Sequence, residues 1–174
     1  MRKDYEIILN LIPENSKVLD IGCSDGELIT YLENKGVSAQ GVELNQEKVI
    51  KCLEKGLDVI HGDINLIVED FPFNQFDYCL LTQTIQAVQE PDKLLNTLKK
   101  VSKNIIVSFN NSARLSKISN FLLTGSFDSL LKKADSDHWY NTNYIHPCSI
   151  KDFKKLATDL DLKIISTFDV LTQK

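Results

Sequence analysis

One stretch near the start of the chain, Val18–Glu27, constrains the fold more than any other part of the sequence. It combines an apolar strand (Val18–Ile21), a turn containing two glycines and the beginning of a helix. Two later apolar segments run into Glu43 and Asp63 and repeat the pattern of a strand that ends at a carboxylate. Because open α/β sheets bind ligands outside the carboxyl ends of their strands, this order predicts a ligand site lined by acidic side chains.

The rest of the chain alternates short apolar segments with amphipathic ones. Strands are expected at 18–21, 37–43, 57–61, 76–82, 104–109 and 162–170, and helices at 4–11, 27–35, 47–55, 92–103 and after 149. This alternation predicts an α/β fold, a doubly wound, mostly parallel sheet with helices on both faces. Ser149 and Asp152 have the spacing of a capping box at the start of the last helix.

The length of 174 residues favours a single domain, 1–174. The region 110–148 interrupts the alternation, and we expect it to be an insertion with short helices at about 115–123 and 127–134 and an aromatic, polar loop.

Composition excludes several classes of function. The net charge of −4 argues against nucleic acid as a partner, since phosphate binding needs a basic face. No apolar run approaches the length of a membrane span, so no membrane is expected. The four cysteines lack the paired spacing of a metal site, so we expect no bound metal. Scattered cysteines of this kind are typically reduced thiols, which predicts a cytoplasmic protein.

The charges around the glycine turn favour S-adenosylmethionine over a dinucleotide. A dinucleotide loop needs glycine at its second fingerprint position, whereas this turn has Gly22, Ser24 and Gly26. Asp20 and the two acids beside the turn would repel a pyrophosphate. S-adenosylmethionine has no phosphate and carries a sulfonium and an ammonium, which suit acidic surroundings.

The two later carboxylates complete the expected cofactor site. Glu43, about twenty residues after the turn, is placed to accept hydrogen bonds from both ribose hydroxyls. Asp63 is placed to accept from the adenine amine, with Ile64 packing on the ring, and Leu44 and Gln83 follow their strands at the same edge. Gln83 is also compatible with a simple turn role.

These residues resemble the class I S-adenosylmethionine-dependent methyltransferases, a Rossmann-like superfamily, over roughly residues 16–110. A narrower resemblance, to the MetW family of methionine biosynthesis proteins, covers almost the whole chain. It is carried by Ser16–Leu28, Thr82–Val88 with Pro91 and Asp92, and Trp139–Thr142 with Asn143, Ile145, His146 and Cys148. The resemblance implies a methyltransferase-like domain that acts alongside homoserine O-acyltransferase. Folds of this superfamily usually close with an antiparallel last strand beside the fifth strand, so a chain end at Lys174 leads us to expect a truncated form or an open slot there.

The loop 137–146 is the expected site of a methyl acceptor, because it combines aromatic faces, amides and histidines. Tyr140 and His146 are the candidate catalytic residues, His146 as a base near neutral pH. Structural roles for both residues stay open. Methyl transfer depends mainly on alignment and exclusion of water, so a dedicated base is not required.

Two functions therefore remain from the sequence. One is an accessory protein that binds S-adenosylmethionine or S-adenosylhomocysteine and modulates the acyltransferase. The alternative is an active methyltransferase on a small-molecule acceptor. Both predict the same cofactor site.

Overall fold

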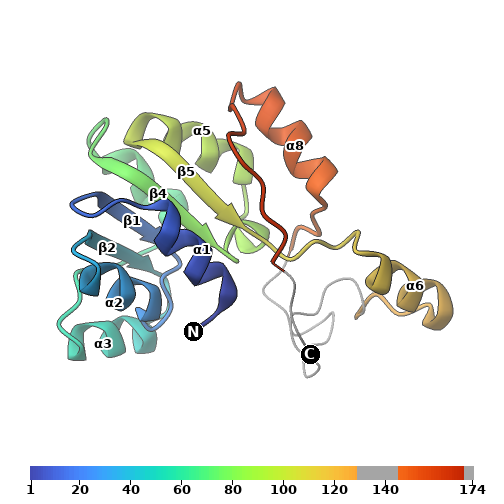
Figure 1. Cartoon of the computed structure of the whole chain (residues 1–174), viewed down its shortest axis with the longest axis horizontal. Coiled ribbons are helices and arrows are strands. Elements are labelled where there is room, and N and C mark those ends of the chain that lie inside the picture. The colour runs from blue at the N-terminus through green and yellow to red at the C-terminus, as the bar shows by residue number, and fades with distance from the viewer. Residues whose placement is uncertain (129–144, 171–174) are drawn as a thin grey trace.

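The computed structural model describes residues 1–128 and 145–170. Its centre is a five-stranded, wholly parallel sheet with the order β3-β2-β1-β4-β5 (Figure 1). The strands are β1 (Lys17–Ile21), β2 (Ser38–Glu43), β3 (Val59–His61), β4 (Phe76–Thr82) and β5 (Ser102–Ser108). The chain reverses its direction of travel across the sheet between β1 and β4, where open α/β sheets form a crevice for ligands.

Helices cover both faces of the sheet, as the alternation predicts. The described helices are α1 (Lys3–Leu11), α2 (Glu27–Asn34), α3 (Gln46–Glu54), α4 (Ile64–Ile67), α5 (Pro91–Val101), α6 (Leu115–Thr124) and α8 (Ile150–Asp159), with 3₁₀ turns η1 (Val68–Asp70) and η2 (Ile85–Ala87), and all of the helices except α6 lie against the sheet. The capping box of Ser149 and Asp152 is present at the start of α8. The doubly wound α/β fold class is thereby confirmed.

Two apolar clusters, one on each face, hold these layers together. Side chains of α1, α2 and α3 pack on one face around Val18 and Leu80, which are fully buried. Side chains of α4, η1 and α5 pack on the other face around Leu19 and Leu81, with α8 at the margin of this cluster. Successive residues of β1 and β4 thus point to opposite faces, and both faces are buried, as expected of central parallel strands.

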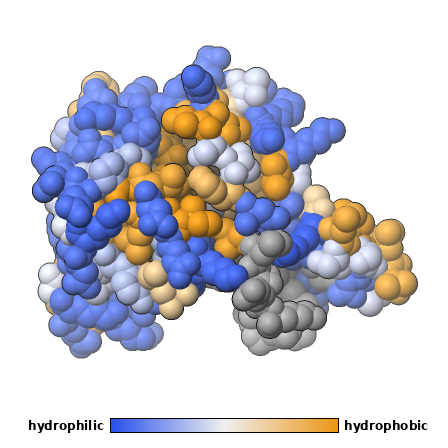
Figure 2. All heavy atoms as spheres, viewed as in Figure 1, coloured by the Kyte–Doolittle hydropathy of each residue, from blue (hydrophilic) through white to orange (hydrophobic). Residues whose placement is uncertain are grey.

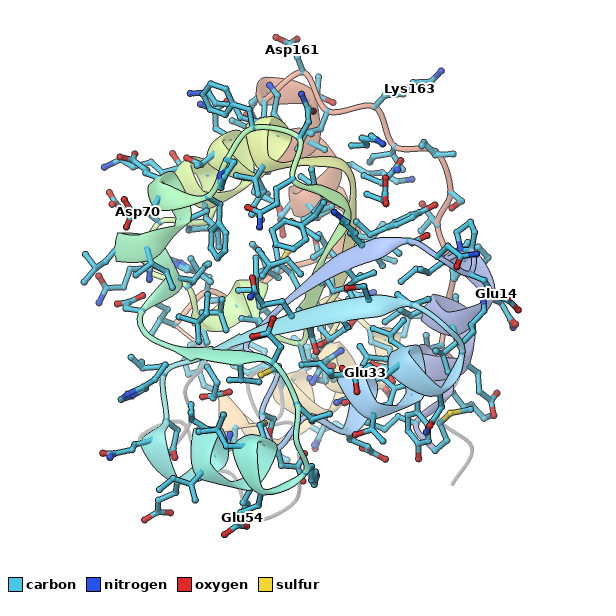
Figure 3. The ribbon with its side chains drawn as sticks, turned by 90° about the vertical axis from the view of Figure 1, so that its left-hand side faces the viewer. Glu14, Glu33, Glu54, Asp70, Asp161 and Lys163 are labelled. Atoms are coloured by element: carbon cyan, nitrogen blue, oxygen red, sulfur yellow. The ribbon has the colours of Figure 1, made fainter. Side chains whose placement is uncertain are left out.

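Charged side chains lie at the outer ends of this framework. Glu54 closes α3, and Asp161 and Lys163 follow α8; all three are exposed and point away from the body of the molecule (Figure 3). Across the part of the chain that the structure describes, no helix is long and apolar enough to cross a membrane.

The expected sixth strand is wrong. Residues 162–170 form no regular strand, and Ile165 and Phe168 remain 82% and 53% exposed. A strand needs a hydrogen-bonded neighbour, and β5 is the last strand of the described sheet.

The interrupted region is described only in part. Helix α6 confirms the helix expected at about 115–123, and it stands apart from the sheet and its covering helices (Figure 1). The helix expected at 127–134 and the loop with Tyr140 fall mostly or wholly outside the described residues.

Candidate cofactor site at the carboxyl edge

The sheet brings the predicted cofactor residues into one row. Following the strand order, Asp63 comes after β3, Glu43 ends β2, Asp20 lies in β1 before the glycine turn, and Gln83 comes after β4. The strands are parallel, so these positions share the carboxyl edge of the sheet. The row crosses the point between β1 and β4 where a ligand is expected.

The glycine turn is held close to its neighbours at both ends. Gly22 has a φ of +74°, its N–H donates to Val42 O at 2.8 Å, and a Cβ there would lie 2.7 Å from Thr84 Oγ1. Gly26 has a φ of +77° and is the N-cap residue of α2. Side chains at these positions would be strained, so glycine keeps the backbone of the turn open toward the edge.

Ser24 also adopts a left-handed conformation, with a φ of +56°. Non-glycine residues reach this region at a cost of roughly 1–2 kcal/mol. Its backbone N–H donates to Glu43 Oε2 at 2.9 Å, which offsets part of that cost. The serine that replaces glycine is thus tied by its backbone to the acidic residue of the next strand.

Glu43 is the centre of the site. The residue is 8% exposed, and its carboxylate accepts two backbone hydrogen bonds, from Ser24 to Oε2 and from Asn45 to Oε1 at 2.8 Å. Each carboxylate oxygen has two lone pairs, so one acceptor position per oxygen is left beyond these bonds. A preoriented carboxylate with two remaining acceptor positions matches the two hydroxyls of a ribose.

Asp20 supplies a buried acid behind the turn. It is 1% exposed, and Thr82 Oγ1 donates to its Oδ1 at 3.5 Å. Burial raises the pKa of Asp20 to about 7; the hydrogen bond from Thr82 opposes this shift, and nearby Glu43 adds to it. A cation placed at this edge would favour the ionised form of Asp20 and would lower that pKa.

The residues expected around the adenine occupy the end of β3. Asp63 caps α4, with Oδ1 accepting from the backbone N–H of Asn65 at 2.9 Å and from its side-chain amide at 2.7 Å. Ile64 is 8% exposed and belongs to the apolar core, so only a small part of it can reach a ligand. Leu44 is 65% exposed beside Glu43. The adenine role of Asp63 and Ile64 and the cofactor contact of Leu44 stay predictions.

Gln83 follows β4 in a left-handed turn with a φ of +60°. Its backbone N–H donates to Ser108 O at 2.9 Å, and its side-chain amide lies 3.5 Å from Ser108 Oγ. The turn role is present, and contact with a cofactor stays a prediction.

Of the two candidate catalytic residues, only His146 is described. Its ring Nε2 lies 3.1 Å from Gln89 O, a carbonyl that can only accept, so Nε2 carries the proton and Nδ1 is left as the basic nitrogen. The ring is exposed to solvent. Tyr140 lies outside the described residues, and its role stays a prediction.

A residue that the sequence analysis did not single out, Gln86, joins the two stretches that carry the family resemblance. Its side chain is 2% exposed and accepts from Asn110 N–H at 2.9 Å, while its backbone O accepts from Ile145 and His146 at 2.9 and 3.1 Å. Cys148 adds a bridge to Asn111, so both ends of the inserted region meet here. Gln86 stands between the apolar Ile85 and Ala87, four positions after the buried strand β4 ends, and this pattern was the sequence signal that could have identified it.

Metal ligation has no support in residues 1–128 and 145–170, where no three His, Cys, Asp or Glu side chains come together in a group suited to an ion. The four cysteines are free thiols, and burial raises the pKa of Cys23 and Cys79. Cys23, Cys52 and Cys79 act as apolar fillers in the core, whereas Cys148 is half-buried.

Strand order, glycine turn and carboxylate row together define a class I methyltransferase fold. A solved structure titled as a S-adenosylmethionine-dependent methyltransferase from Aquifex aeolicus has a TM-score of 0.69 and 19% identity, covering 96% of this chain and 84% of its own. The family model for "Methionine biosynthesis protein MetW" matches residues 2–174. The chain therefore belongs to the MetW family.

Two further relatives show how far function varies on this framework. A "Bifunctional methionine biosynthesis protein MetXA/MetW" from Rhodopirellula baltica is 32% identical over 92% of this chain, which spans 27% of that protein's length. The solved [4+2]-cyclase SpnF shares the fold, with a TM-score of 0.66 and 16% identity over 91% of this chain and 56% of its own. This fold thus also occurs in a protein described as a cyclase.

Proposed function

We propose that this chain binds S-adenosylmethionine or S-adenosylhomocysteine at the carboxyl edge and acts as an accessory protein of a homoserine O-acyltransferase. The main support for this partnership is the relative from Rhodopirellula baltica, a bifunctional protein whose name combines MetXA and MetW. Two modules joined in one relative are good candidates for association in another. The free thiols and biosynthetic family favour a cytoplasmic location.

The cofactor assignment rests on charge and on geometry. Glu43 has two acceptor positions left for ribose hydroxyls, and Asp20 lies beneath the turn where a cationic methionyl group would be placed. Carboxylates at this edge attract a sulfonium or an ammonium and repel a phosphate. The methyltransferase neighbours support the same ligand.

The accessory role is favoured over catalysis by the relative that joins MetXA and MetW in one polypeptide. The candidate base His146 is exposed, and its Nε2 is engaged by a backbone carbonyl. Methyl transfer needs no dedicated base, so the choice between the two functions rests on that relative and not on His146. Binding of the cofactor would report the level of a methionine product to the acyltransferase, and linkage makes that coupling reciprocal.

The alternative, methyl transfer to a small molecule, is favoured by one relative. A ubiquinone biosynthesis O-methyltransferase from Pseudomonas entomophila is 26% identical over 50% of this chain, and the chain spans 40% of its length. Under this alternative His146→Ala lowers turnover at least tenfold while cofactor affinity is unchanged.

The test is an acyltransferase assay with homoserine and an acyl-CoA, run with and without this chain and with and without S-adenosylmethionine. The accessory function predicts a rate that changes when the chain is added and changes again with the cofactor, without production of S-adenosylhomocysteine. An unchanged acyltransferase rate, or stoichiometric conversion of the cofactor with an acceptor, would reject the accessory function.

A further inference from the structure

Helix α6 is an apolar helix without a covering layer in the described structure. None of its residues is buried, and Leu115, Leu122 and Leu123 are 83%, 76% and 85% exposed. Phe127, just beyond the helix, is 60% exposed and packs on Phe121 at a ring distance of 5.1 Å. Figure 2 shows these apolar side chains gathered over the part of the molecule that projects from the body.

Such a helix needs a partner surface. Ten-residue helices are marginal in water on their own, because most helical stability in proteins comes from burying an apolar face. Leu115, Ile118 and Leu122 recur at helical spacing and form one stripe. Contiguous exposed apolar surface of this kind marks an interaction site.

We infer that α6 is the docking surface for the acyltransferase, a partner that offers an apolar groove. This inference rests on the proposed function. In the bifunctional relative from Rhodopirellula baltica this chain corresponds to 27% of the length, so most of that polypeptide lies outside the matching part and is joined to it in every copy. In that relative, the remaining part of the polypeptide is therefore a candidate to cover the surface that corresponds to α6. The relative that joins both modules makes the acyltransferase, rather than a second copy of this chain, the expected occupant of α6.

The position of α6 links this surface to the cofactor site. The helix follows Asn111, whose bridge to Cys148 and neighbouring bonds to Gln86 lie directly after β4 and β5 at the carboxyl edge. The same short connection holds His146. A partner bound at α6 therefore contacts an element anchored beside the row of carboxylates.

The test compares two exposed apolar residues with equal exposure. Leu122 and Phe73 are each 76% exposed, and Phe73 precedes β4 at the opposite edge of the sheet. Purified homoserine O-acyltransferase is titrated onto wild type, Leu122→Ser and Phe73→Ser, with S-adenosylmethionine affinity and thermal midpoint measured for each. Loss of one interfacial leucine predicts acyltransferase binding weaker by about tenfold or more for Leu122→Ser, with Phe73→Ser like wild type.

The outcomes separate this inference from the proposed function. Wild type that does not bind the acyltransferase removes both. Equal binding of wild type and Leu122→Ser overturns only the assignment of α6. Weaker cofactor binding by Leu122→Ser, or a wild-type dimer that Leu122→Ser dissolves while acyltransferase binding is kept, also overturns it, because α6 would then cover its own site or a second copy.

Discussion

At high pH the Asp20→Asn variant should have a markedly larger free energy of unfolding than wild type. Burial raises the folded-state pKa of Asp20 to about 7 from an ordinary value of 3.8. Below pH 3.8 the carboxyl of Asp20 is protonated in both the folded and the unfolded state, so its burial does not lower stability through ionisation. Between these pH values the folded protein holds a proton that the unfolded chain releases, so stability falls as pH rises, and the penalty is complete above pH 7.

A shift of about three pKa units corresponds to a penalty of at most about 4 kcal/mol at pH 8 and roughly 2 kcal/mol at pH 5. Asparagine has nearly the same shape and no ionisable group, so its own hydrogen bonding with Thr82 is the same at both pH values. The wild type should therefore lose roughly 2–3 kcal/mol relative to Asp20→Asn between pH 5 and pH 8. Urea unfolding of both proteins measures this, and an identical difference at the two pH values would refute the buried carboxyl as its source.

Three other results follow from the site. The affinity of wild type for S-adenosylmethionine, measured by calorimetry, should rise between pH 6 and pH 8, because a bound cation favours the ionised form of Asp20. Asp20→Asn should abolish this rise. A rise that persists in the variant would point to another titrating group. Gly22→Ala, which would press on Thr84 at a positive φ, should destabilise by about 1–3 kcal/mol in urea unfolding, and an unchanged midpoint would contradict the tight turn. Gln86→Leu leaves the N–H of Asn110 without its acceptor and should cost about 1–3 kcal/mol, with faster hydrogen exchange at that amide as the diagnostic sign.

Local patterns predicted most of the framework. The apolar run of β4 was predicted to the residue, and the capping box at Ser149 placed the start of α8, because burial on both faces and side-chain capping are encoded in adjacent residues. Residues 162–170 are a case in which the local pattern predicted a strand that the structure does not contain. Their apolar content suits a strand, but a strand also needs a neighbour in space, which local sequence does not specify.

The site was predictable to a similar depth. The row of Asp20, Glu43 and Asp63 follows from strand ends in a parallel sheet, which short-range patterns locate. The hydrogen bond between Glu43 and Ser24 joins residues nineteen positions apart, and Gln86 reaches sixty positions to His146. Such long-range contacts depend on how loops pack, so the sequence analysis found the acids and missed Gln86.

The most direct measurement is the calorimetric affinity for S-adenosylmethionine of wild type, Glu43→Gln and the exposed control Glu47→Gln. Charge-assisted hydrogen bonds from the ribose to Glu43 predict that Glu43→Gln weakens binding by about 1.5–3 kcal/mol, whereas Glu47→Gln leaves it unchanged. Wild type that shows no binding, or Glu43→Gln that binds as tightly as wild type, would contradict a cofactor site at the carboxyl edge of this sheet.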